Sequence, residues 1–173
     1  MRAVMSSSGS VFVTDQDEPT GIGELITVTS AGICGSDLHL ISSGISGVIL
    51  GHEFGGFTAD GTLVAVRPTG ECGSCAQCTT GFPHTCHQAA ASLHGTSING
   101  GLAEFVRVES SRLVSVPTGT DPATVGLVEP LFVVIHGINR VSLPKGMSAL
   151  VVGSGSIGLL TAAELADRGI TVD

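Results

Sequence analysis

The chain has 173 residues, of which 42% are apolar and 13% charged, and it carries 25 glycines and a net charge of −8. Only seven residues are Lys or Arg, which argues against nucleic acid or an anionic membrane as the main partner, because both bind clustered basic side chains. No signal-peptide pattern opens the chain, and its most apolar stretches are too short to cross a bilayer. We expect a globular, cytoplasmic protein whose cysteines stay reduced.

The first two thirds of the sequence predict a mainly β structure. Residues 24–33, ELITVTSAGI, alternate apolar and polar side chains and are rich in β-branched residues, which is typical of a strand. Residues 62–68 and 102–108 follow the same pattern, and Gly- and Ser-rich turns separate the three segments. No helical periodicity is convincing before about residue 122.

The pattern changes at residues 121–141. Asp121 and Pro122 form an N-cap followed by a first-turn proline, and the apolar run after Pro130 predicts a buried helix. Residues 148–173 predict a strand, a glycine turn, a helix and a second strand. The sequence therefore predicts a β-rich domain over residues 1–142 and the beginning of an α/β domain over residues 143–173.

Four of the five cysteines lie in one short segment, CGSCAQCTTGFPHTC. Their spacing, C-x2-C-x2-C-x7-C, suits a closed tetrahedral Zn²⁺ site that has no open position for substrate. A redox pair would need a thioredoxin-like context, and the ferredoxin spacing for an iron–sulfur cluster is not met. We predict a structural zinc ion held by Cys72, Cys75, Cys78 and Cys86.

A second metal site is predicted around Cys34 and His52. A thiolate and an imidazole suit a catalytic zinc, which needs three protein ligands and one open position. Glu129 is the candidate third ligand, because a carboxylate at the start of an apolar helix is costly unless it is compensated. Glu53 is the alternative, as a ligand or as a neighbour of one. A favourable interaction with the helix dipole would also explain why an acidic residue, Glu129, stands at the start of this helix.

The segment GSGSIG follows an apolar strand and opens a helix, which is the context that a dinucleotide-binding fingerprint requires. Gly153 permits the tight turn, Gly155 the approach of a pyrophosphate, and Gly158 the packing of helix on strand. The amides of Ser156 and Ile157 would face the phosphates. We expect the ribose-reading acid a few positions beyond Asp173, which leaves NAD or NADP open, with NAD slightly favoured.

Six segments taken together resemble the zinc-dependent medium-chain dehydrogenases, in the order in which they occur in that family. They are AGICGSDLH, GHEFGG, the four-cysteine segment, GGLAEFV, EPLFVVIHG and VVGSGSIG. The resemblance spans essentially the whole chain, favours the polyol and threonine dehydrogenase branch through EPL, and identifies the chain as the N-terminal half of such an enzyme. It implies a GroES-like (chaperonin-10-like) catalytic barrel with a zinc lobe, followed by the truncated start of a Rossmann domain.

The same resemblance implies the functional roles. Cys34, His52 and Glu129 fall at catalytic-zinc positions with Glu53 beside them, and Ser36 and His39 fall at proton-relay positions. The whole enzyme would bind two Zn²⁺ per chain, transfer hydride between an alcohol or polyol and NAD(P), and form a homo-oligomer. We expect this chain to be a fragment that binds zinc without turnover. A stand-alone, non-enzymatic zinc-binding β module is the alternative.

Overall fold

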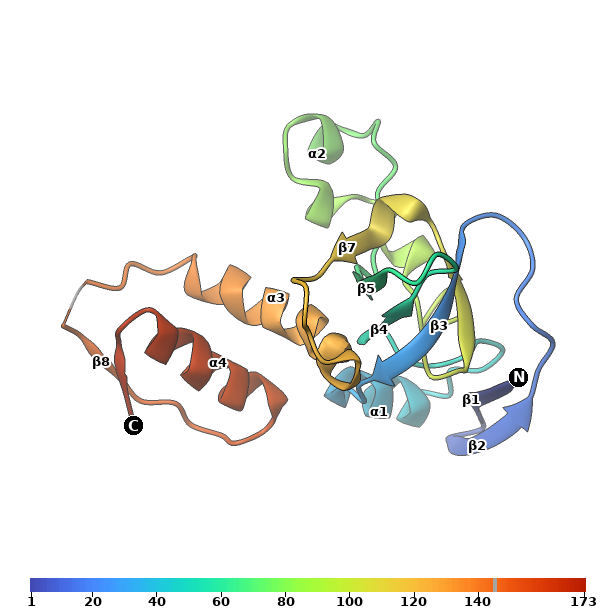
Figure 1. Ribbon diagram of the computed structural model, residues 1–173, viewed down its shortest axis with the longest axis horizontal. Coiled ribbons are helices and arrows are strands. Elements are labelled where there is room, and N and C mark those ends of the chain that lie inside the picture. The colour runs from blue at the N-terminus through green and yellow to red at the C-terminus, as the bar shows by residue number, and fades with distance from the viewer. Residues whose placement is uncertain (145) are drawn as a thin grey trace. The chain divides into compact units, whose positions relative to one another are not determined.

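A computed structural model describes residues 1–144 and 146–173 of the chain (Figure 1). These residues form two compact units, Met1–Leu127 and Val128–Asp173. The elements of the first unit are β1 (Arg2–Ser7), β2 (Ser10–Asp15), β3 (Glu24–Ala31), α1 (Gly35–Ser42), β4 (Phe54–Phe57), β5 (Leu63–Val66), α2 (Ala76–Thr79), β6 (Phe105–Val108) and β7 (Leu113–Ser115), with 3₁₀ turns η1 (Pro83–Thr85), η2 (Ala90–Ser92), η3 (Ser110–Arg112) and η4 (Pro122–Leu127). The second unit holds α3 (Val128–Ile138), β8 (Ser148–Ala149), α4 (Ser156–Asp167) and β9 (Thr171–Val172).

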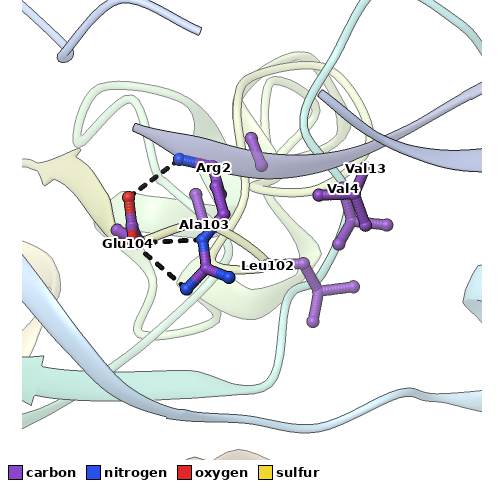
Figure 2. A pocket seen from close by; sticks show the side chains of 7 residues that line it. Arg2, Val4, Val13, Leu102, Ala103 and Glu104 are labelled. Atoms are coloured by element: carbon purple, nitrogen blue, oxygen red, sulfur yellow. Dashed lines mark hydrogen bonds and ion pairs between the residues drawn. The ribbon is translucent and has the colours of Figure 1, made fainter. Parts of the chain in front are cut away.

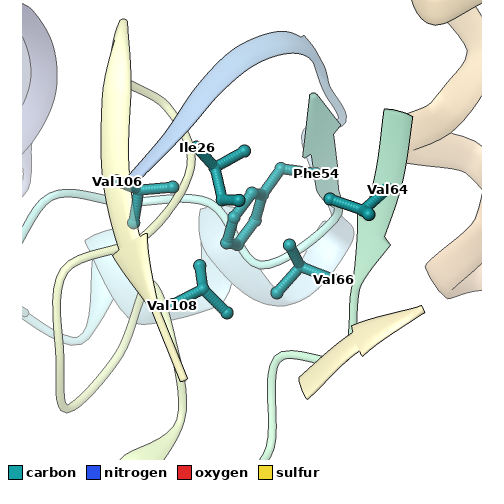
Figure 3. Packing of buried hydrophobic residues seen from close by; sticks show 6 residues of the cluster. All are labelled: Ile26, Phe54, Val64, Val66, Val106 and Val108. Atoms are coloured by element: carbon teal, nitrogen blue, oxygen red, sulfur yellow. The ribbon is translucent and has the colours of Figure 1, made fainter. Parts of the chain in front are cut away.

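The core of the first unit is an antiparallel sheet in the order β6-β3-β4-β5-β7. Alternate side chains of these strands point to one side, so the β-branched residues of the sequence gather there (Figure 3). The predicted strands are confirmed as β3, β5 and β6, each slightly shorter than its sequence pattern. The buried cluster consists of Ile26, Phe54, Val64, Val66, Val106 and Val108.

The expectation of no helix before residue 122 is wrong, because α1 and the short α2 precede it. Helix α1 buries a single residue, Asp37, so it has no apolar stripe for a periodicity argument to find. Local capping defines its start instead: Cys34 is the N-cap, and its amide donates to the Asp37 carboxylate at 2.9 Å. This helix places Cys34 and Ser36 at its N-terminal end.

The N-terminal hairpin of β1 and β2 also went unpredicted, and Figure 2 shows how its first strand is fixed. Arg2 donates through its amide to Glu104 at 2.8 Å, and its guanidinium approaches the same carboxylate at 3.4 Å. The Val4 amide donates to the Leu102 carbonyl. The GGLAEFV segment therefore anchors the start of the chain, and these residues line a small surface pocket.

In the second unit, the predicted order of strand, glycine turn, helix and strand is confirmed. Strands β8 and β9 pair in parallel, and α3 packs on α4 around Val134, Ile138, Leu165 and Ile170. Helix α3 therefore belongs to this unit, whereas the boundary predicted at residue 142 groups it with the β-rich part. Among the helices of residues 1–144 and 146–173, none combines the length and hydropathy of a membrane span.

Candidate metal centres

The four clustered cysteines converge in the loop that carries α2, which we call the cysteine lobe (residues 69–91). Their sulfur atoms all lie within 4.8 Å of one another. Cys75 Sγ is 3.5 Å from Cys78 Sγ and 3.9 Å from Cys86 Sγ, and the Cys72–Cys78 separation is 4.0 Å. A tetrahedron of sulfurs about 2.3 Å from Zn²⁺ has edges of about 3.8 Å. The cluster therefore has the dimensions of a closed zinc site.

Backbone amides point at these sulfurs, as thiolate ligands require. The Cys75 amide donates to Cys72 Sγ at 3.3 Å, and the amides of Cys72 and Gln88 donate to Cys86 Sγ at 3.4 Å. Hydrogen bonds from the Ser74 and Cys75 amides lower the pKa of Cys72 to about 6, which favours the thiolate that binds metal. Without a metal, burial and the neighbouring cysteines raise the pKa of Cys78. The donor set fits zinc, and the segment contains no disulfide.

The second cluster brings together Cys34, His52 and Glu53, whose ligand atoms also lie within 4.8 Å of one another. Cys34 precedes α1, while His52 and Glu53 precede β4, which pairs with β3. Glu53 is buried, and a Cβ on Gly32 would lie 2.2 Å from its Oε2. Glycine at position 32 thus leaves room for the carboxylate. One thiolate, one imidazole and one carboxylate fit a zinc site with an open fourth position.

Asp37, which the sequence pattern did not single out, lies beside this cluster. Its side chain is 1% exposed, and its Oδ1 lies 3.2 Å from Nδ1 of His52 while its Oδ2 accepts the Cys34 amide. The hydrogen bond with Asp37 raises the pKa of His52 to about 9. Because Nδ1 is engaged, Nε2 is the nitrogen left for a metal, the arrangement that commonly orients a ligating histidine. Asp37 lies three residues after Cys34 in the segment GICGSDLHL, and this proximity is the sequence feature that could have indicated its role.

The remaining predicted site residues are placed as follows. The Ser36 hydroxyl lies 3.4 Å from His52 Nε2, and Ser36 and His39 are both exposed, one turn apart on α1. Their relay role stays a prediction. Glu129 is the second residue of α3 and belongs to the other compact unit. Its role as the third ligand therefore also stays a prediction.

The glycine turn of the second unit has the local geometry that its motif predicts. Gly153 has a φ of +116°, which favours glycine. A Cβ on Gly158 would lie 2.1 Å from the Gly153 carbonyl oxygen, whereas one on Gly155 would meet nothing within 4 Å. Helix α4 begins at Ser156 and carries the unpaired amides of a helix N-terminus. The Asp173 amide donates to Ala149, so Asp173 is still within the strand ladder.

Proteins of known structure share this fold over nearly the whole chain. The crystal structure of galactitol-1-phosphate dehydrogenase from Escherichia coli superposes with a TM-score of 0.89 at 27% identity, covering 99% of this chain and 54% of that one. Sorbitol dehydrogenase of Halalkalibacterium halodurans is 33% identical over 95% of this chain and 52% of its own length. L-idonate 5-dehydrogenase (NAD(P)(+)) of Escherichia coli is 29% identical over 96% and 54%.

Residues 23–118 match the family described as the alcohol dehydrogenase GroES-like domain. The chain therefore belongs to this family, and the resemblance to zinc-type medium-chain dehydrogenases is confirmed. The predicted fold class, a mainly β GroES-like domain with a zinc lobe, is confirmed with it. The chain spans about half the length of the curated relatives that it matches.

Proposed function

We propose that the whole protein is a zinc- and NAD(P)-dependent oxidoreductase acting on the CH–OH group of an alcohol or polyol. The observation that carries this proposal is the convergence of Cys34, His52 and Glu53 within 4.8 Å, beside a serine hydroxyl and a buried aspartate. The sugar-alcohol and sugar-acid dehydrogenases among the relatives support the substrate class. NAD is slightly favoured over NADP.

The residues divide the chemistry between them. A zinc ion held by Cys34, His52 and one carboxylate would lower the pKa of a substrate hydroxyl, and a bound nicotinamide would supply the hydride acceptor. Asp37 orients His52 by holding its Nδ1. The Ser36 hydroxyl would accept the substrate proton and pass one toward His39, whose imidazole faces solvent. Gly153, Gly155, Ser156, Ile157 and Gly158 would hold the dinucleotide phosphates.

The cysteine lobe supplies a second, structural zinc, giving two Zn²⁺ per chain. Metal analysis tests both sites: Cys34→Ser should remove one ion, and Cys75→Ser the other. If the chain holds one zinc ion and still holds it after Cys34→Ser, the catalytic-site assignment is contradicted. Glu53→Gln and Glu129→Gln, compared in the same way, identify the third ligand, because only loss of the true ligand should release the ion of the Cys34 site.

Activity is tested on the whole protein by NAD(P)⁺ reduction with polyols, secondary alcohols and threonine. Turnover with one of these classes, abolished by Cys34→Ser, is the expected result. No turnover from a metal-loaded protein with any of them would favour the non-enzymatic zinc module instead. A cytoplasmic location and homo-oligomeric assembly complete the proposal; reduced thiol ligands favour the first.

A further inference from the structure

One buried arginine lies where the cysteine lobe joins the sheet. Arg112, the last residue of η3, is 3% exposed. Its Nη1 donates to the carbonyl of Ser92 at 2.6 Å and to that of Pro68 at 3.3 Å, and its Nε donates to Glu109 at 3.2 Å. A buried guanidinium is costly unless it is hydrogen-bonded. The three partners account for its burial.

The two carbonyl partners are the residues that flank the lobe. Pro68 lies four positions before Cys72, and Ser92, the last residue of η2, lies six positions after Cys86. A single nitrogen of Arg112 therefore joins both stems. Gly70 completes the contact, because a Cβ there would lie 2.3 Å from Arg112 Nη2 and 2.6 Å from the Ser92 hydroxyl.

The four sulfurs depend on these stems unequally. Cys75 caps α2 and Cys78 lies within it, so a local turn sets the distance between these two. Cys72 and Cys86 are fourteen positions apart, with Cys72 just beyond Gly70. Cys86 is linked to Ser92 through two successive turns, Ala89 to the Cys86 carbonyl at 3.1 Å and Ser92 to the Ala89 carbonyl at 3.2 Å. The stems thus act on the outer pair together with the direct hydrogen bond from the Cys72 amide to Cys86 Sγ.

We propose that Arg112 is a positioning residue for the metal of the cysteine lobe: by joining the Pro68 and Ser92 carbonyls it holds Cys72 and Cys86 at metal-binding separation. The inference rests on the proposed zinc site. Other charged groups face the same region, since Glu71 pairs with Arg67 and Glu109 is largely exposed. Glu109 is the ion-pair partner of Arg112 itself.

The test measures the rate at which Co²⁺ leaves the cysteine lobe for a chromophoric chelator, in a Cys34→Ser background so that the lobe's ion is observed alone. Arg112→Ala should accelerate release about tenfold or more, as expected for the loss of charge-assisted hydrogen bonds. Gly70→Ala crowds the guanidinium without removing it and should also accelerate Co²⁺ release. Arg112→Lys keeps the positive charge but loses the planar set of guanidinium donors, so its rate of Co²⁺ release should lie between those of the parent chain and Arg112→Ala.

Arg107→Ala is the matched control, because its guanidinium also donates to two main-chain carbonyls, those of Pro19 and Gly23, at 3.1 and 2.7 Å. It should lower the midpoint of thermal unfolding without changing the Co²⁺ release rate. Equal release rates for Arg112→Lys, Gly70→Ala and the Arg107 control would overturn the inference. A parent chain that binds no Co²⁺ at the lobe would instead overturn the zinc site itself.

Discussion

Replacing Asp37 by asparagine separates the charge of this buried residue from its shape. In the protein, Oδ2 accepts the Cys34 amide at 2.9 Å while Oδ1 engages His52 Nδ1 at 3.2 Å. An asparagine that keeps its oxygen on the Cys34 amide must present its NH₂ group to His52 Nδ1. That donor would drive the imidazole proton onto Nε2, the nitrogen needed by the metal. We expect the Cys34 site to bind Zn²⁺ roughly 10- to 100-fold more weakly.

The assay is an equilibrium competition with a chromophoric chelator, together with NMR titration of His52 in the metal-free chain. The pKa of His52 should be about 9 in the parent chain and fall toward its ordinary value of 6.5 in Asp37→Asn. Asp121→Asn is the control, since that carboxylate also accepts a backbone amide, from Ala123 at 2.9 Å. Zinc affinity within twofold of the parent, with an unshifted His52 pKa, would refute the orienting role.

Five further outcomes are expected. Zinc affinity of the Cys34 site should rise with pH up to about 9, because the ion displaces the His52 proton. A zinc affinity that does not change between pH 6 and 8 would contradict this expectation. In the metal-free chain the His52–Asp37 pair stabilises the fold fully below pH 6.5, and this stabilisation is lost as the pH rises through about 9. Gly32→Ala, whose Cβ would meet Glu53, should lower the zinc affinity of that site about tenfold, as measured by chelator competition. Gly35→Ala adds a Cβ in open space and should leave the affinity unchanged. Gly158→Ala should lower the free energy of unfolding in urea by about 1–3 kcal/mol, because the added Cβ would meet the Gly153 carbonyl oxygen. Gly155→Ala should leave this free energy nearly unchanged, and equal effects of the two substitutions would argue against the turn geometry. Ile26→Ala in the sheet core should cost about 2–5 kcal/mol, and Ile22→Ala, 96% exposed, less than about 0.5 kcal/mol.

Features encoded in short segments were predictable from the sequence. The cysteine lobe follows from spacing alone, because C-x2-C turns bring sulfurs together locally, and the structure places all four within 4.8 Å. The GSGSIG turn is equally local: the φ of Gly153 and the close approach at Gly158 involve residues five apart. The strand within residues 24–33 was recognisable because alternate apolar side chains, Ile26 and Val28, pack in the core.

Features that depend on distant pairing were not predictable in the same way. Glu53 reaches Cys34 only because β4 pairs with β3, which brings it against Gly32. Nothing near Glu53 in the sequence ranks it above Glu129 as a ligand. Asp37 carried no predicted role, because only the fold sets His52 beside it. Helix α1 was missed because capping, rather than an apolar stripe, defines it.

The two metal centres are preorganised in different ways, and this difference bears on what each can do. In the cysteine lobe, backbone amides donate to the sulfurs. Four thiolates there would complete the coordination of a zinc ion and leave it no position for substrate. At Cys34, the supporting hydrogen bonds come from one buried carboxylate that holds both the helix cap and the imidazole. A zinc ion held there by three donors from two separate segments would keep one position open, and the Ser36 hydroxyl lies 3.4 Å from His52 Nε2. Only the second arrangement would admit a substrate oxygen, which is why we propose that the chemistry takes place at Cys34 and not at the clustered cysteines.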